Sequence, residues 1–164
     1  MFEHALRPGS IGSLRLANRV VMGSMHLGIE SDESALAAFY AERARGGAGL
    51  IVTGGSAVSR TGAGGRNYSF INDAASAEVL AGAARAVHEA GGRIALQLFH
   101  AGRYAYESSF GLQPVAPSAV PSRFSPDPPR ALDDAEILET IDDFARGAAR
   151  AKEIGFDAVE VMAS

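Results

Sequence analysis

A small group of side chains near the ends of the apolar runs of this sequence could bind a ligand. Its members are Ser24, Met25, His26, Gly54, Gly55 and Gln97. Glycines let a ligand approach the backbone closely, a thioether is soft and polarisable, and an amide donates and accepts hydrogen bonds in one plane. The sequence has neither a Ser/His/Asp arrangement for nucleophilic catalysis nor a cluster of metal ligands. This chemistry suits a flat heteroaromatic ligand better than a hydrolytic or metal site.

The composition is that of a globular domain. The 164 residues are 47% hydrophobic and 21% charged, which excludes a disordered tail or a coiled coil. The net charge is −4 and the Lys and Arg residues form no run, so we expect neither nucleic acid nor a membrane as a partner. The absence of cysteine excludes disulfides and thiolate nucleophiles within these residues. With no signal-peptide pattern and no apolar run long enough to span a bilayer, the expected location is cytoplasmic.

Short apolar runs alternate with helical patterns along the chain. The apolar runs lie at 19–25, 50–58, 93–100 and 158–164, and the helical patterns at 33–45, 76–90 and 133–155. The runs lack strict polar alternation, which is typical of strands buried on both faces. Ser76 is the predicted N-cap of the second helix, and Asp133 with Glu136 is an Asp version of a capping box for the third. This order predicts an α/β fold with a parallel sheet, either doubly wound or part of a barrel.

Two further segments accompany these elements. Residues 11–18 alternate apolar and polar side chains and predict a small hairpin that closes one end of the sheet. The connection from Ala105 to Leu132 is rich in proline, and a loop of this length in a compact domain is usually functional or disordered. In parallel α/β folds ligands bind at the carboxyl ends of the strands, so we expect the ligand-binding group to gather there.

Gln97 stands inside an apolar run, where a buried amide needs hydrogen-bond partners. Such an amide commonly pairs with the backbone of its own sheet, and the alternative is that a bound ligand satisfies it. We interpret His100 and Arg103 as structural residues that pair with carboxylates or carbonyls beneath the site. His88 is interpreted as a surface residue near the end of its helix, where a cation is favoured.

Five sequence motifs follow one another along the chain. They are NRVVMGSM (18–25), AFYAERARGGAGLIVTGG (38–55), QLFHAGRY (97–104), VAPSAV (115–120) and GFDAVEVMAS (155–164). Together they resemble the N-terminal half of the Old Yellow Enzyme family of flavin oxidoreductases, and they look closest to its 2,4-dienoyl-CoA reductase branch. The resemblance implies a parallel (β/α)8 TIM barrel. Residues 1–164 would supply about its first four βα strands, which is the N-terminal half of an FMN-binding domain.

The resemblance also implies an activity and a binding mode. Members reduce an activated C=C bond, here of enoyl or dienoyl-CoA type, with FMN as cofactor and NADH or NADPH as reductant. Ser24 and Met25 would lie along the flavin. Gly55 would leave room for its ring, and Gln97 would hydrogen-bond its pyrimidine edge. His26 and Tyr104 would lie on the side of the small-molecule substrate.

Two departures from the family pattern affect the catalytic residues. Met162 stands where many simple ene-reductases of the family have a His that anchors the substrate carbonyl. Dienoyl-CoA reductases instead use a Tyr beyond this strand as the proton donor, and the sequence stops at Ser164, before that Tyr. The catalytic residue therefore stays unknown. Any iron–sulfur cysteines and FAD domain of such a protein would also lie downstream.

Other interpretations of the same motifs stay open. One is another flavin barrel of the family, such as an enone reductase or an amine dehydrogenase, and another is a non-catalytic half-barrel that only binds or assembles. Taken alone, the chain is expected to be inactive and to self-associate, because half a barrel leaves open sheet edges and an uncovered inner face. We expect Val21, Ile51 and Leu96 on that inner face.

Overall fold

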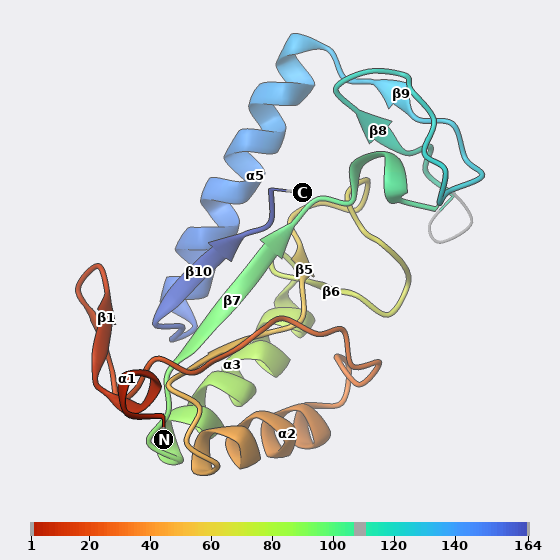
Figure 1. Cartoon of the computed structure of the whole chain (residues 1–164). Helices are drawn as coiled ribbons and strands as arrows, with labels where there is room; N and C mark the ends of the chain where they lie inside the picture. The colour runs from red at the N-terminus through yellow and green to blue at the C-terminus, as the bar shows by residue number, and fades with distance from the viewer. Residues whose placement is uncertain (1, 107–110, 164) are drawn as a thin grey trace.

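The computed structural model describes residues 2–106 and 111–163, which form a parallel sheet covered by helices on one face (Figure 1). The main strands are β3 (Val21–Met22), β4 (Leu50–Val52), β5 (Ser56–Ala57), β7 (Ile94–Phe99) and β10 (Ala158–Val161). β3 pairs with β4, both β4 and β5 pair with β7, and β7 pairs with β10, all in parallel. Figure 1 shows β7 and β10 side by side, with α5 beyond them.

The order of the strands distinguishes the two predicted architectures. β4 and β5 both pair with β7 and are two parts of one broken strand, so the neighbours across the sheet follow the order of the chain. A doubly wound sheet reverses its order at a switch point, whereas a (β/α)8 barrel keeps chain order throughout. The chain therefore forms one side of a TIM barrel, as predicted.

Long helices connect the strands: α2 (Glu33–Arg45), α3 (Ala74–Glu89) and α5 (Asp134–Glu153). The predicted capping box is confirmed, because the Asp133 side chain accepts from the Glu136 backbone and the Glu136 side chain accepts from the Asp133 backbone. The prediction of Ser76 as an N-cap is wrong. Asp73 is the N-cap of α3, and the backbone N–H of Ser76 donates to its carboxylate. A carboxylate accepts this hydrogen bond as well as a hydroxyl does and also favours the positive end of the helix.

Alternate residues of the strands face two different layers. Ile51 and Leu96 are fully buried, with 0% exposure, in the core that the sheet shares with α2, α3 and α5. Leu50 and Ala95 face the opposite, inner side, where they pack with Leu16. The prediction that Ile51 and Leu96 face inward is therefore wrong. Both strands are apolar on their two faces, so no alternation in the sequence distinguished the helix side from the inner side.

The inner face is closed at one end by a hairpin of β1 (Gly9–Ile11) and β2 (Leu14–Leu16), which pair antiparallel. This confirms the predicted hairpin, although it begins before residue 11. Leu16 is buried against Leu50 and near Ala158, the first residues of β4 and β10, so the hairpin covers the amino ends of the strands. The carboxyl ends remain the open end of the half-barrel.

Several short elements have no counterpart in the predicted pattern. They are α1 (Glu3–Leu6), β6 (Ser69–Phe70) parallel to β5, the 3-10 helix η1 (Gly102–Tyr104), β8 (Val115–Ala116) and β9 (Arg130–Ala131). β8 and β9 pair in parallel, so the middle of the long loop is hydrogen-bonded to its C-terminal end. Residues 107–110 of that loop lie outside the described part of the chain.

The two outer strands of the sheet, β3 and β10, each leave an apolar side chain exposed. Val21 lies opposite Leu50 in the parallel register, faces inward as predicted and is 47% exposed. Val161, at the end of β10, lies opposite Leu98 on the helix side of the sheet and is 57% exposed. Within the described residues, no helix has the length and apolar character needed to cross a membrane.

Candidate functional site

The carboxyl ends of the strands bring three predicted residues together. Ser24 follows β3, Gly55 lies in the break between β4 and β5, and Gln97 lies within β7. The Ser24 hydroxyl donates to Oε1 of Gln97 at 2.9 Å. A Cβ added at Gly55 would lie 3.0 Å from the same Oε1. These three residues thus lie close together at the carboxyl ends of the strands, as the sequence predicted.

Gln97 is half-buried, and its amide is bound at both ends by protein. Its Nε2 donates to Oε1 of Glu160, in β10, at 2.6 Å, and its backbone N–H donates to Oγ1 of Thr53 at 3.3 Å. A glutamine amide has two N–H groups and two carbonyl lone pairs. Among the described residues, one of each is used, by Glu160 and Ser24. One N–H and one lone pair remain for a ligand on the inner side.

Glu160 is a site residue that the sequence reasoning missed. It lies directly opposite Gln97 in the parallel register of β7 and β10, so the two side chains share the inner face. The available signal was a single charged residue within the otherwise apolar strand AVEV. Its significance depends on the register, which the sequence does not specify.

Gly55 packs against the aromatic ring of Phe99. A Cβ at this position would lie 2.7 Å from Cδ1 of Phe99, closer than real Cβ contacts come. Phe99 is 7% exposed and belongs to a small core with Ala57 and Ala63. The glycine therefore allows the Phe99 ring and the Gln97 amide to approach the backbone. Contact between Gly55 and a bound ring stays a prediction.

Gly54, after β4, packs against the backbone that follows β3. A Cβ there would lie 2.6 Å from the carbonyl oxygen of Met25, so only glycine allows the backbone after β3 to pack here. The Gly54 N–H donates to the hydroxyl of Tyr40 at 3.0 Å, and burial raises the pKa of that hydroxyl. The Met25 side chain itself is 48% exposed at the open end of the sheet, where a ligand could cover it.

His26 is held in place by two neighbours. Its Nδ1 lies 2.9 Å from Oε1 of Glu30, and its ring stacks on Tyr68 with centroids 4.1 Å apart and planes 5° from parallel. Glu30 is buried and also accepts from the backbone N–H of Leu27 at 2.6 Å. Its second oxygen is buried without a hydrogen-bond partner among the described residues. Glu30 and Tyr68 were not identified from the sequence.

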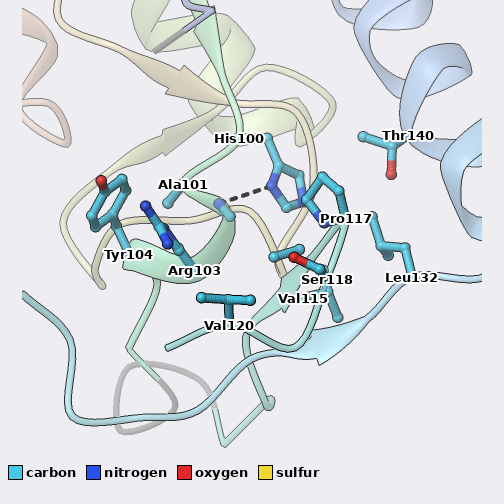
Figure 2. Close-up of a pocket in the computed structure, with 12 residues that line it drawn as sticks. His100, Ala101, Arg103, Tyr104, Val115, Pro117, Ser118, Val120, Leu132 and Thr140 are labelled. Carbon is cyan, nitrogen blue, oxygen red and sulfur yellow. Dashed lines mark hydrogen bonds between the residues drawn. The ribbon is translucent and has the colours of Figure 1, made fainter. Parts of the chain in front are cut away.

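Tyr104 lines a cavity to which Gln97 does not contribute. A cavity of about 460 Å³ is formed by η1, β8, the loop that follows β8 and the start of α5 (Figure 2). Figure 2 shows Arg103 and Tyr104 on one side of it and Leu132 and Thr140 on the other. The Tyr104 ring also packs near Phe124, with centroids 5.9 Å apart. That Tyr104 lies on the substrate side stays a prediction.

His100, directly after β7, and His88, in α3, both have partners within the protein. His100 accepts from the backbone N–H of Gly102 at 3.1 Å, and burial lowers the pKa of its imidazole. The partner is a backbone N–H and not the carboxylate or carbonyl that the sequence led us to expect. His88, predicted as a surface residue, is partly exposed and lies 2.9 Å from Oδ2 of Asp157, which also accepts from the Ile94 backbone. His88 thus links α3 to the start of β7 and to the turn before β10.

Comparison with known proteins identifies the family. Residues 5–164 match the NADH:flavin oxidoreductase / NADH oxidase family. The chain belongs to this family. Its fold matches morphinone reductase with a TM-score of 0.89 and 36% identity, covering 96% of the chain and 48% of that structure. It matches an Old Yellow Enzyme homologue from Zymomonas mobilis with a TM-score of 0.84 and 32% identity, covering 96% of the chain and 47% of that structure.

Curated relatives in this family differ in length. The chain is 42% identical to a metal reductase from Desulforamulus reducens over 160 residues, 96% of the chain and 24% of that protein. It is 36% identical to an NADH oxidase from Thermoanaerobacter brockii, over 98% of the chain and 26% of that protein. The chain thus spans about a quarter of these relatives. The resemblance to Old Yellow Enzymes is confirmed, and the dienoyl-CoA reductase branch stays a prediction.

The residues of the site fit the flavin that this family uses. The pyrimidine edge of an isoalloxazine offers a hydrogen-bond donor between two acceptors, and the free N–H and lone pair of Gln97 match a neighbouring pair of these groups. Ser24 fixes the amide from one side, and the exposed Met25 side chain offers an apolar surface. In the described part of the chain no group of three or more His, Asp or Glu side chains could hold a metal ion.

Proposed function

We propose that the full-length protein is an FMN-dependent oxidoreductase that reduces an activated C=C bond, of enoyl or dienoyl-CoA type, with NADH or NADPH. The observation that carries the proposal is the Gln97 amide, which is fixed by Ser24 at the carboxyl ends of the strands and keeps a donor and an acceptor for a ligand. Bound FMN would supply hydride transfer between the nicotinamide and the alkene.

The chain's own residues would bind and orient the flavin. Gln97 would hold its polar edge, and Met25 would cover part of its ring. Leaving a buried polar edge unpaired costs free energy, so a fixed amide favours one orientation of the ring over others. Gly55 would contribute by letting Gln97 and Phe99 pack closely at the strand break.

His26 is the proposed residue on the substrate side. Because its Nδ1 is committed to Glu30 and its ring is stacked on Tyr68, Nε2 is the ring atom left for a substrate oxygen. The proton donor of the reaction is not assigned to a residue of this chain, since the resemblance places a Tyr donor beyond Ser164.

Relatives support the specific alternatives to different degrees. The chain covers 24% of the metal reductase and 26% of the NADH oxidase, so these relatives extend well beyond one barrel. Downstream iron–sulfur and FAD regions in this protein stay part of the proposal. An NADPH dehydrogenase from Geobacillus, of which it covers 46%, and morphinone reductase favour a simple enone reductase. An N,N-dimethylglycine/sarcosine dehydrogenase, 31% identical, favours an amine dehydrogenase. A non-catalytic half-barrel is the remaining alternative.

Anaerobic turnover of the purified full-length protein tests the proposal. NADH or NADPH oxidation would be followed with a 2-enone and with a 2,4-dienoyl-CoA, and flavin bleaching would be followed with sarcosine. Faster turnover of the dienoyl-CoA supports the proposed substrate class, and faster turnover of the enone supports the simpler reductase. Bleaching by sarcosine alone would support an amine dehydrogenase. A protein without bound flavin would contradict the proposal.

A further inference from the structure

The amide of Gln97 lies between two side chains with different hydrogen-bonding abilities. On one side the Ser24 hydroxyl lies 2.9 Å from Oε1. On the other side the Glu160 carboxylate lies 2.6 Å from Nε2. A hydroxyl can donate or accept, so Ser24 could pair with either end of the amide. An ionised carboxylate can only accept, so Glu160 pairs only with the NH2 end.

The two orientations of the amide are not equivalent for a ligand. In the observed orientation, the free lone pair of Oε1 can accept from a donor on the ligand's edge. The free N–H of Nε2 can donate to a neighbouring acceptor on the same edge. A rotation of 180° about the last side-chain bond exchanges these positions. At a fixed ring position, the reversed amide places acceptor against acceptor and donor against donor.

We infer that Glu160 is a positioning residue that holds the Gln97 amide in the orientation that pairs with the flavin's pyrimidine edge. This inference rests on the proposed function, because it assumes that Gln97 contacts FMN. Glu160 acts through Gln97. The register places Glu160 directly opposite Gln97 on the neighbouring strand, so the contact is built into the sheet.

A series of substitutions separates orientation from charge. Glu160→Gln removes the preference, because a second amide can donate or accept, and a binding-competent fraction of one half weakens FMN binding by about twofold. Glu160→Lys offers only donors and favours the reversed amide. A competent fraction of about one tenth or less then weakens binding by about tenfold or more. A purely Coulombic role predicts the opposite order, because a cation near the anionic FMN should strengthen its binding.

The experiment uses FMN titration of the full-length apoprotein, followed by flavin fluorescence. The matched control is Glu78→Lys, which makes the same charge change at an exposed position of α3. Each Glu160 variant is also combined with Gln97→Leu. We expect affinity to fall from wild type to Glu160→Gln to Glu160→Lys, with no effect of the control. In the Gln97→Leu background the Glu160 effects should vanish.

Three results would overturn the inference. FMN binding by Glu160→Lys that equals or exceeds that of wild type would show that charge, not orientation, dominates. A loss that persists in the Gln97→Leu background would show that Glu160 does not act through Gln97. Wild-type protein that does not bind FMN would refute the proposed function and this inference with it. If Glu160→Lys does not fold, Glu160→Gln decides the question, because its twofold loss must also vanish in the Gln97→Leu background.

Discussion

Gly55 is the position at which the smallest change should have the clearest effect. In Gly55→Ala, the new Cβ would lie 2.7 Å from Cδ1 of Phe99 and 3.0 Å from Oε1 of Gln97, whereas ordinary contact begins at 3.4 Å. Neither neighbour can move freely. Phe99 is buried in the core of Ala57 and Ala63, and Gln97 is hydrogen-bonded at both ends.

The expected magnitude follows from this overlap. Overpacking a closely packed site costs about 1–3 kcal/mol, which corresponds to roughly 5- to 150-fold in the folding equilibrium. A Gly-to-Ala change also stabilises the protein by about 0.4–1 kcal/mol, because it lowers the conformational entropy of the unfolded state. The control must therefore also be a Gly-to-Ala change. Gly65→Ala is suitable, because its Cβ would meet the Tyr68 ring at an ordinary 3.6 Å.

Urea unfolding and FMN titration of the full-length variants provide the assay. Gly55→Ala should be less stable than Gly65→Ala by about 1–3 kcal/mol and should bind FMN more weakly, because the displaced Phe99 ring and Gln97 amide move together. Gly55→Val adds two methyl groups to the same contact and should release FMN. The reasoning is refuted if Gly55→Ala matches Gly65→Ala in both stability and FMN affinity.

Four further outcomes are expected. Gln97→Leu should weaken FMN binding roughly 5- to 150-fold, since unpaired buried polar groups cost about 1–3 kcal/mol; equal FMN occupancy after dialysis would contradict this. Met25→Leu, of similar volume, should keep FMN but shift its reduction potential in a spectroscopic titration, and an unchanged potential would remove Met25 from the site. Because burial lowers the pKa of His100 below 6.5, protonation favours the unfolded state, so the free energy of unfolding should fall as the pH drops through 6.5, and less so in His100→Asn. The isolated 164-residue chain should self-associate and reduce no enone, as light scattering and turnover assays would show; a monodisperse monomer that holds FMN would contradict this.

The sequence predicted some features of this fold well because they depend on local chemistry. The helix over 33–45 and the capping box at Asp133 follow from side chains a few residues apart. The facing of Ile51 and Leu96 could not be predicted, because strands that are apolar on both sides carry no signal for inner and outer faces. The predicted strands were too long for a similar reason, since an apolar run does not show where the hydrogen bonds between strands stop.

The residues of the candidate site also differ in how far the sequence could predict them. Residues next to the strand ends, such as Ser24 and Gln97, could be found because parallel strands deliver their carboxyl ends to one edge. Glu160 and Tyr68 could not, because their roles depend on strand register and on the packing of a loop far away in sequence. Tyr104 lies in η1 and lines a cavity beside His100, a placement that depends on the turn after β7 and that the sequence does not specify.

We propose that FMN binds at the strand ends around Gln97. The most direct test is the FMN content of the full-length protein after gel filtration, measured by releasing the flavin with denaturant and separating FMN from FAD. We expect one FMN per chain at this barrel, and we expect Gln97→Leu to lose it while staying folded. If wild-type protein that is refolded or purified in the presence of FMN still carries none, FMN does not bind at this site.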